Sequence, residues 1–220
     1  MTRVGTCRLI EDVGIVPVVR APSAEIAMRA VDALLRGGLS IFEITMTVPN
    51  ARAVIRSLTT RFKDAAVIGA GTVLSAEEAR MCVDDAGAQF IVSPGLDLGT
   101  IDAAHALDVA VVPGALTPTE VITASKAGAD MVKIFPCSAV GGAKYLKALK
   151  GPLPHVKLMP TGGISLSNAH EFIAAGAAAI GIGSELVDIA ALSEGRDVEL
   201  SARACELVKA VAAARSRISA

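Results

Sequence analysis

Eight short apolar runs recur along this chain at intervals of about 21 to 26 residues, the length of one β-strand followed by one α-helix. The runs begin near Ile15, Ser40, Ala66, Gln89, Ala110, Met131, Lys157 and Ala179. This recurrence restricts the chain to folds in which strands and helices alternate.

Alanine-rich amphipathic segments fill the intervals between the runs, and they predict helices over 24–36, 51–62, 76–86, 98–107, 118–127, 143–149 and 168–175. Helix-capping residues precede some of them, and glycines follow others: Ser23, Ser75 and Ser167, then Gly37, Gly87, Gly128 and Gly176. We also expect a helix within residues 2–13 and a last helix over roughly 198–218.

Eight repeats with uniformly apolar strands predict an α/β fold, a (β/α)8 TIM barrel with an N-terminal helix. An open doubly wound sheet is the alternative, but a GxGxxG turn after the first strand is absent. The sequence Gly181-Ile182-Gly183-Ser184 stands at the end of the last strand rather than after the first, and it breaks that pattern. Because no linker, charge run or low-complexity segment divides the chain, we expect one domain over residues 1–220.

Composition excludes several classes of partner. No apolar run reaches the roughly 18 residues of a membrane span, and the N-terminus lacks the pattern of a secretory signal, so we expect a cytoplasmic protein with no membrane partner. Four scattered cysteines suggest neither a disulfide framework nor a zinc cluster. A net charge of −1 and 3% aromatic residues argue against nucleic acid. The expected partner is a small molecule or another copy of the chain.

A single cation stands inside the apolar run 130–136. Strand alternation puts Met131, Lys133 and Phe135 on one face. A buried lysine is costly unless it is paired or loses its charge, and enzymes use a neutral buried amine to attack carbonyl groups. The alternative is a lysine that reaches out of the strand end into solvent.

Glu43 is the second charged residue inside an apolar strand. Alternation places it on the face of Ile41 and Thr45, and the second and sixth strands are both even-numbered. Glu43 and Lys133 are therefore expected in the same or adjacent layers of the barrel lumen. A structural ion pair is the alternative, but buried pairs stabilise a fold poorly compared with apolar packing. The pattern favours an acid–base pair.

Glycine-bearing turns follow the seventh and eighth strands, at Thr161-Gly162-Gly163 and at Gly183-Ser184. Barrels commonly bind phosphate here through bare backbone N–H groups, and the Ser184 hydroxyl would add a donor. Glycines could also serve only as tight turns. Their occurrence after both strands favours a phosphate site.

Metal ligands are not suggested by the sequence. His105, His155 and His170 fall away from the carboxyl ends of the strands and lack ligand spacing, so we expect solvated surface histidines. Cys137 is expected to be a small buried thiol. We therefore expect no metal site.

Seven motifs occur in order and at matching spacing, and together they resemble the 2-keto-3-deoxy-6-phosphogluconate (KDPG) aldolases. They are Glu43-Ile44-Thr45, Gly69-Ala70-Gly71-Thr72-Val73, Ser93-Pro94-Gly95, Pro113-Gly114, Lys133-Ile134-Phe135-Pro136, Pro160-Thr161-Gly162-Gly163-Ile164 and Gly183-Ser184. The family also includes 4-hydroxy-2-oxoglutarate (KHG) aldolases and phosphogalactonate enzymes. The resemblance runs from about Ile15 to the chain end.

The resemblance implies a class I aldolase of carbohydrate metabolism in the Entner–Doudoroff pathway, needing no cofactor and typically a homotrimer. Lys133 would form a Schiff base with the C2 ketone of the phosphorylated 2-keto-3-deoxy sugar acid, and Glu43 would shuttle protons. The pyruvate part would be lined by Thr72, Pro94, Phe135 and Thr161, and the phosphate would be held by Gly162, Gly163, Gly183 and Ser184.

One departure from the family pattern concerns a cation. Many gluconate-type members carry an arginine where this chain has Thr47, and Arg20 at the end of the first strand is the expected substitute. A cation there would fix an anion, either carboxylate or phosphate, and help to keep Lys133 neutral. The substrate therefore stays open among KDPG, its galactonate epimer and KHG.

Other functions remain as alternatives to the aldolase. A phosphate-sugar isomerase or a decarboxylase could use the same barrel without an imine. A catalytically silent phosphate-binding barrel would keep the glycine turns, but it has no need for Glu43 and Lys133 inside strands.

Overall fold

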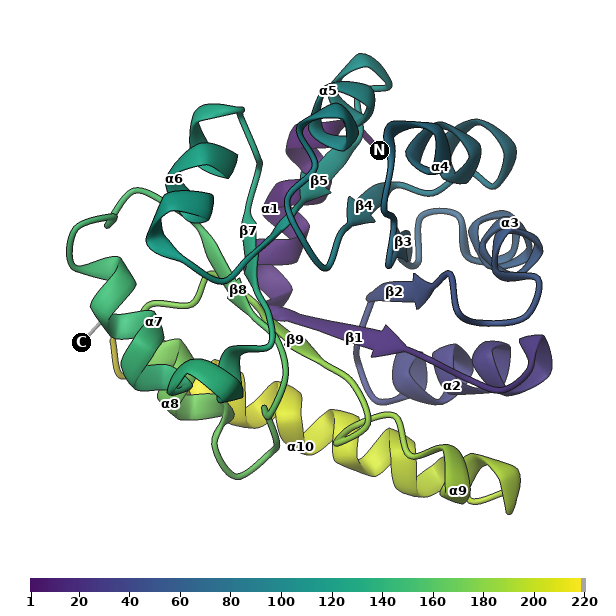
Figure 1. Ribbon diagram of the computed structural model, residues 1–220. Helices are drawn as coiled ribbons and strands as arrows, with labels where there is room; N and C mark the ends of the chain where they lie inside the picture. The colour runs from purple at the N-terminus through teal and green to yellow at the C-terminus, as the bar shows by residue number, and fades with distance from the viewer. Residues whose placement is uncertain (219–220) are drawn as a thin grey trace.

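A computed structural model describes residues 1–218 of the chain (Figure 1). Strands and helices alternate as the apolar runs predicted. The strands are β1 Ile15–Val19, β2 Ile41–Thr45, β3 Val67–Gly71, β4 Phe90–Val92, β5 Ala110–Val112, β6 Gly114–Ala115, β7 Val132–Ile134, β8 Leu158–Pro160 and β9 Ile180–Ile182. The α-helices are α1 Arg3–Val13, α2 Ala24–Arg36, α3 Ala51–Phe62, α4 Ala76–Arg80, α5 Leu98–Ala106, α6 Pro118–Lys126, α7 Ala143–Lys150, α8 Ala169–Ala174, α9 Ile189–Ser193 and α10 Asp197–Ser216.

The strands form two parallel sheets. The larger has the order β5-β4-β3-β2-β1-β9, and the smaller has the order β6-β7-β8. β5 and β6 are one run of the sequence, interrupted at Pro113, and an isolated parallel bridge pairs Thr161 with Gly181 beside β8 and β9. The architecture is thus an α/β fold whose parallel sheet curls into a half-barrel, with helices around its outer side (Figure 1).

Two hydrophobic clusters lie on opposite faces of the curled sheet. Ile41 and Met131 belong to the inner cluster, together with Phe90 and Met159. Their neighbours in the sequence, such as Phe42 and Val132, belong to the cluster between strands and helices. This alternation along each strand is the period of two expected for extended chain, and both faces are apolar because both are buried.

The N-terminal helix α1 packs against the inner cluster through Ile10. Thr2 caps its first turn, and Gly14 ends it at φ 71°. Arg3 forms an ion pair of 2.9 Å with Asp130, whose carboxylate also accepts a hydrogen bond from the backbone N–H of Val111. The predicted N-terminal helix is confirmed, and it lies at the end of the sheet from which β7 starts.

Several boundaries differ from the sequence expectation. The segment 76–86 continues from α4 into a π-helix, Met81–Asp85, rather than staying α-helical. The expected last helix is α10, but the short helix α9 before it was not predicted, nor was the 3-10 helix Cys137–Val140. Ser23 and Ser75 cap their helices, whereas α8 begins after Asn168 and takes no cap from Ser167. These short elements carry too few residues for a periodic pattern to identify them.

None of the helices within residues 1–218 has the length and apolar character that crossing a lipid bilayer requires.

Candidate active site

Lys133 lies in the middle of β7, paired with Gly114 on one side and Met159 on the other. Its backbone N–H donates to the Pro113 carbonyl at 2.8 Å, so the strand holds its Cα firmly. Only 5% of the residue is exposed. The side chain therefore does not reach out of the strand end into solvent, and the expectation of a buried lysine is confirmed.

Glu43 faces Lys133 from β2. Its Oε1 lies 3.7 Å from the lysine Nζ, and the residue is 1% exposed. That separation makes an ion-pair contact that is longer than a hydrogen bond. The two charged groups expected from alternation to share the interior of the sheet are therefore in contact, although they are 90 residues apart in the sequence.

Both carboxylate oxygens of Glu43 are buried without a hydrogen-bond partner among residues 1–218. Burial raises the pKa of the Glu43 carboxyl, and the positive charges of Lys133 and Arg20 oppose that rise. A carboxyl group with a raised pKa can exchange protons nearer to neutral pH than an ordinary glutamate. The arrangement suits proton transfer better than it suits stability.

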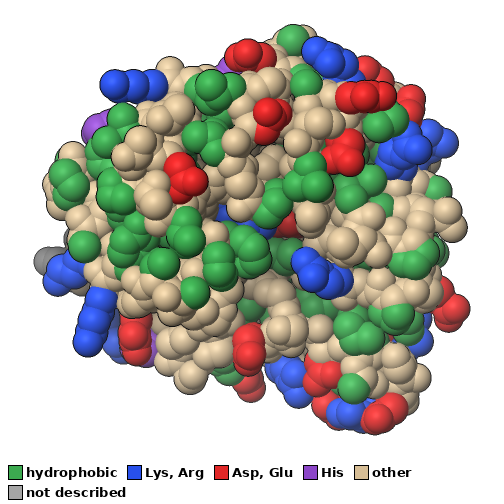
Figure 2. Space-filling model, in the orientation of Figure 1, with side chains coloured by type: hydrophobic (Ala, Val, Ile, Leu, Met, Phe, Trp, Pro, Cys, Tyr) green, Lys and Arg blue, Asp and Glu red, His purple; other side chains and the backbone are tan. Residues whose placement is uncertain are grey.

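A cavity of about 760 Å³ opens above this pair. The eleven site residues expected from the sequence all line it: Arg20, Glu43, Thr72, Pro94, Lys133, Phe135, Thr161, Gly162, Gly163, Gly183 and Ser184. Figure 2 shows the hollow near the middle of one face, with hydrophobic and uncharged surface around it and most charged side chains farther out. The cavity therefore brings the candidate residues together at the carboxyl ends of the strands.

Lys133 and Glu43 form the floor of the cavity, and Phe135 and Thr161 also line it. The Phe135 ring lies with its centroid 5.2 Å from the lysine Nζ, a distance at which a cation is attracted to an aromatic face. Thr161 is 5% exposed, directly follows β8 and lines the same cavity as the pair. Phe135 thus packs against Lys133, as expected from its place on the same strand face.

Thr72 has a left-handed backbone, with φ 61°. A β-branched residue rarely adopts this conformation, and such strain is concentrated at functional sites. Thr72 directly follows β3, so the strained turn lies at the cavity that this residue lines. This backbone outlier gives an independent reason to count Thr72 among the site residues.

The cation expected at the mouth is Arg20, an exposed side chain directly after β1. Thr47, where many gluconate-type members carry arginine, also lines the cavity, and its hydroxyl lies 2.8 Å from that of Thr45. The side chain at position 47 is therefore short and neutral, while Arg20 brings positive charge to the same cavity.

The glycine turns after β8 and β9 form another part of the rim, and the turn after β9 lies beside the end of β1 and Arg20, because β9 pairs with β1. Gly162 and Gly163 have φ values of 94° and 73°, a region that favours glycine, and the Asn168 side chain donates to the Gly163 carbonyl at 2.9 Å. Ser184 is exposed on the loop between β9 and α9. The bare backbone and the hydroxyl are the groups expected to bind an anion.

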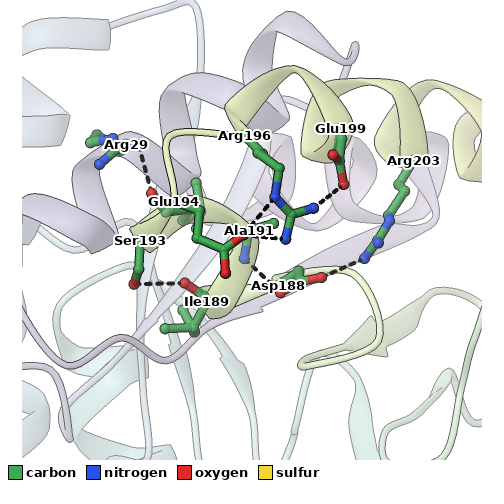
Figure 3. Close-up of polar contacts among 10 residues, drawn as sticks. Arg29, Asp188, Ile189, Ala191, Ser193, Glu194, Arg196, Glu199 and Arg203 are labelled. Atoms are coloured by element: carbon green, nitrogen blue, oxygen red, sulfur yellow. Dashed lines mark hydrogen bonds and ion pairs between the residues drawn. The ribbon is translucent and has the colours of Figure 1, made fainter.

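Ion pairs hold the loop that carries Ser184 (Figure 3). Asp188 caps α9 by accepting from the Ala191 N–H at 3.0 Å, and Arg203 of α10 donates to the same carboxylate at 3.0 Å. Arg29 of α2 donates to the Leu192 carbonyl at 2.7 Å. Hydrogen bonds that Asp188 accepts from the Ala191 N–H and from Arg203 lower the pKa of its carboxyl. This part of the rim is held by partly buried side chains rather than by strand pairing.

A family model described as KDPG and KHG aldolase matches residues 7–202. The chain belongs to this aldolase family. The match confirms the resemblance read from the motifs and the prediction that the protein is an aldolase. It also spans every strand and each residue of the cavity named above.

Characterised relatives of two kinds cover most of the chain. The 2-dehydro-3-deoxy-phosphogluconate aldolase of Haemophilus influenzae is 37% identical over 75% of this chain and 77% of its own length. The 2-dehydro-3-deoxy-6-phosphogalactonate aldolase of Escherichia coli K12 is 36% identical over 89% of this chain and 93% of its own. Both kinds of aldolase are thus about equally similar to this member of the family.

A solved structure of the family has a comparable fold. The KDPG aldolase of Legionella pneumophila, with pyruvate captured as a covalent carbinolamine intermediate, has a TM-score of 0.84 and 30% identity over 91% of this chain and 97% of that chain.

Some cavity residues of this aldolase were not predicted as site residues: Val18, Ala21, Pro22, Ile164, Gly181, Glu185, Val187 and Ile189. Thr47 was named only as the position that lacks the arginine of many members. Val18 pairs in register with Glu43, so strand alternation in β1 would have pointed to it. Glu185 follows Ser184 directly, and an exposed carboxylate beside an anion site was a signal worth weighing.

Histidines and cysteines take little part in the site. Residues 1–218 contain no cluster of three or more metal-binding side chains. His155 and His170 are exposed as expected, but the prediction for His105 is wrong, because its Nε2 is buried and finds no partner in the described part of the chain. Burial raises the pKa of the Cys137 thiol to about 11, as suits a small buried thiol.

Proposed function

We propose that this protein is a class I aldolase that cleaves KDPG into pyruvate and glyceraldehyde 3-phosphate through a Schiff base at Lys133. The observation that carries the proposal is the contact of 3.7 Å between the Lys133 amine and the Glu43 carboxylate on the floor of one cavity. The Legionella relative, which captures pyruvate as a covalent carbinolamine, supports the same chemistry.

The reaction needs an acceptor for the electrons of the bond that breaks. Lys133 passes a proton to Glu43, and its neutral amine adds to the C2 ketone to give a carbinolamine. Glu43 returns the proton to the carbinolamine hydroxyl, which leaves as water, so that a protonated imine and the Glu43 carboxylate remain. Glu43 takes the proton of the C4 hydroxyl, the C3–C4 bond breaks, and its electron pair moves into the imine to give an enamine. The aldehyde leaves, C3 is protonated, and water releases pyruvate and the free amine.

The remaining cavity residues divide between the two halves of the substrate. Thr72, Pro94, Phe135 and Thr161 would surround the pyruvate part. The phosphate would lie at the two glycine turns, where Gly162, Gly163, Gly183 and Ser184 offer N–H groups and a hydroxyl. This reaction uses amine and carboxylate chemistry throughout, so we propose no metal and no cofactor.

A second substrate is supported by a specific observation. Arg20 brings a cation to the cavity while position 47 is a threonine, a pattern of galactonate-type and of some gluconate-type members, and the E. coli phosphogalactonate aldolase is 36% identical. The alternative function is therefore cleavage of 2-dehydro-3-deoxy-6-phosphogalactonate. Comparison of kcat/KM for the two epimers and for KHG would rank the three substrates, and we expect KHG, which lacks a phosphate, to be the poorest.

Borohydride trapping tests the proposed chemistry. Reduction in the presence of pyruvate should inactivate the protein and add a pyruvate-derived mass to the peptide that contains Lys133. Lys133→Ala should lose both the adduct and turnover. Retained activity with an unmodified Lys133 would reject the Schiff-base mechanism and favour an isomerase or decarboxylase.

We also propose that the two sheets are parts of one closed eight-stranded barrel in a single domain over residues 1–220. Support comes from the Thr161–Gly181 bridge and from backbone hydrogen bonds that span the sheets, from Ala178 to Leu158 at 2.9 Å and from Asp130 to Val111 at 3.2 Å. Slow amide exchange at Ala178 and Asp130, together with one cooperative unfolding transition, is expected. Rapid exchange at these two amides would argue against closure.

The family resemblance further supports a cytoplasmic homotrimer acting in the Entner–Doudoroff pathway. Light scattering should give three times the mass of one chain, and cell fractionation should recover the activity in the cytoplasmic fraction.

A further inference from the structure

Gly71, the last residue of β3, lies directly beneath the side chain of Glu43. Strand pairing puts Glu43 opposite Gly69 and Thr45 opposite Gly71, and the glutamate side chain reaches forward along β3. A Cβ atom built on Gly71 would overlap the Oε1, Cδ and Cγ atoms of Glu43. The carboxylate thus occupies the space that any other residue at position 71 would need.

Backbone conformation does not explain this glycine. The φ angle of Gly71 lies outside the left-handed region, so an alanine could adopt the same backbone without strain. The requirement for glycine at this position is therefore one of space alone, and the space is taken up by Glu43.

Little else fixes the Glu43 carboxylate. Within residues 1–218 neither oxygen has a hydrogen-bond partner, and the Lys133 amine at 3.7 Å attracts the group without a hydrogen bond. Polar anchors usually hold a catalytic carboxylate in place. Here the β3 backbone at Gly71, which has no side chain, is the surface against which the Glu43 carboxylate lies.

We propose that Gly71 is a positioning residue, whose lack of a side chain lets the Glu43 carboxylate lie against β3 at the distance from Lys133 that proton transfer requires. The inference rests on the proposed function, since it assigns the reaction to these two groups. A methyl group at position 71 displaces the carboxylate from that place and leaves Lys133 itself in β7.

Gly69 provides a matched control. It lies on the same strand and the same face, its φ is also outside the left-handed region, and a Cβ on it would meet the Phe90 ring at 2.5 Å. Alanine at either position overpacks the interior of the sheet. Only the alanine at position 71 collides with the Glu43 carboxylate.

The experiment compares Gly71→Ala and Gly69→Ala, each alone and combined with Glu43→Asp, whose shorter side chain withdraws the carboxylate from the added methyl group. We expect Gly71→Ala to lower kcat about 100-fold, within the usual range for a misplaced proton-transfer group. Adding Glu43→Asp should restore kcat at least about five-fold in the Gly71→Ala protein but lower it further in the Gly69→Ala protein.

A kcat for Gly71→Ala within about three-fold of the unchanged protein, or losses that simply multiply with Glu43→Asp, would overturn the inference. Equal rescue in both alanine backgrounds would overturn it as well, because the effect would then be general packing. If the Gly71→Ala protein does not fold, the Gly71→Ala/Glu43→Asp protein tests the proposal. The proposal requires this double variant to fold, and it is rejected if neither variant folds.

The proposed function is tested separately in the unchanged protein. If borohydride and pyruvate do not label Lys133 there, the Schiff-base mechanism fails whatever the Gly71 variants do. If Lys133 is labelled but Glu43→Asp rescues nothing, the mechanism stands and only the role of Gly71 is rejected.

Discussion

The floor and the rim of the substrate cavity are built in different ways. On the floor, Lys133 and Glu43 project from strands that are hydrogen-bonded to neighbours on both sides, and both residues are almost completely buried. On the rim, the loop after β9 and the short helix α9 are held by partly exposed side chains such as Arg203 (Figure 3).

This difference follows the demands of the proposed reaction. Proton transfer and addition to a carbonyl depend on distances fixed to fractions of an ångström, and strand pairing supplies that rigidity. Binding an anion through several N–H groups tolerates small shifts, and an exposed rim lets substrate enter and product leave. Mutations on the floor should therefore cause large losses in kcat, and mutations on the rim should cause smaller changes in KM.

The largest effect is expected when the polar floor is removed as a unit. Glu43→Leu combined with Lys133→Met should abolish turnover, yet stabilise the protein by about 1–4 kcal/mol, because apolar packing replaces a desolvated ion pair. Lys133→Met alone should destabilise it by about 3–5 kcal/mol, since it leaves the buried carboxylate unpaired. Denaturant unfolding and a turnover assay measure both. A double variant less stable than the single one would contradict the view that the floor is kept for chemistry.

The next largest effect concerns Glu43 alone and its dependence on pH. Glu43→Gln should lower kcat by about 10²- to 10⁴-fold, as expected for loss of a proton-transfer group. Because burial raises the pKa of the Glu43 carboxyl, the acidic limb of kcat/KM in the unchanged protein should lie above the pKa of an ordinary glutamate. The rate should fall as pH falls through that raised pKa, and Glu43→Gln should lose this limb.

The same raised pKa has an opposite consequence for stability. The folded protein binds the Glu43 proton more tightly than the unfolded chain does, so this group stabilises the fold at low pH. That contribution is lost as pH rises from the ordinary glutamate pKa through the raised one. The free energy of unfolding should therefore decline less steeply with rising pH in Glu43→Gln. Equal slopes in the two proteins would show that burial does not perturb this carboxyl.

Much of the floor could be predicted from the sequence because its information is local. A charge within an apolar run marks Lys133 and Glu43, and strand alternation gives the side each faces. Their meeting required the further assumption of a curled sheet with strands two and six on opposite walls, which the repeat of eight units supplied. The contact of 3.7 Å confirms that assumption for these two residues.

The parts that could not be predicted depend on registers and on short segments. The role of Gly71 depends on the register in which β2 pairs with β3. A shift of one residue would put another side chain next to Glu43, and neither strand's own sequence shows which register forms. Pro113 lacks an N–H, and it divides one apolar run into β5 and β6. Helix α9 has five residues, too few for a helical pattern.

On the rim, a modest effect is expected from the ion pair that fixes Asp188. Arg203→Ala should raise KM for the phosphorylated substrate about two- to five-fold, in the range of an exposed ion pair, with little change in kcat. Arg196→Ala is the matched control, since Arg196 bonds to Glu194 and Glu199 instead (Figure 3). Steady-state kinetics decides between them. A fall in kcat, or an equal effect of both variants, would mean that the network supports the fold and not the loop.

The smallest effect is expected from Glu185, whose exposed side chain lines the cavity next to Ser184 and has no ion-pair partner in the part of the chain that the structure describes. A carboxylate here repels a phosphate dianion, so Glu185→Gln should lower KM for the phosphorylated substrate about two-fold at low salt. The gain should vanish as salt screens the charges, and it should be absent with KHG. Glu206→Gln is the control, because Glu206 lines only a neighbouring smaller cavity that Glu185 also borders. An unchanged KM in Glu185→Gln would place the phosphate beyond the reach of this carboxylate. A raised KM would show that Glu185 helps to bind the substrate instead of repelling it.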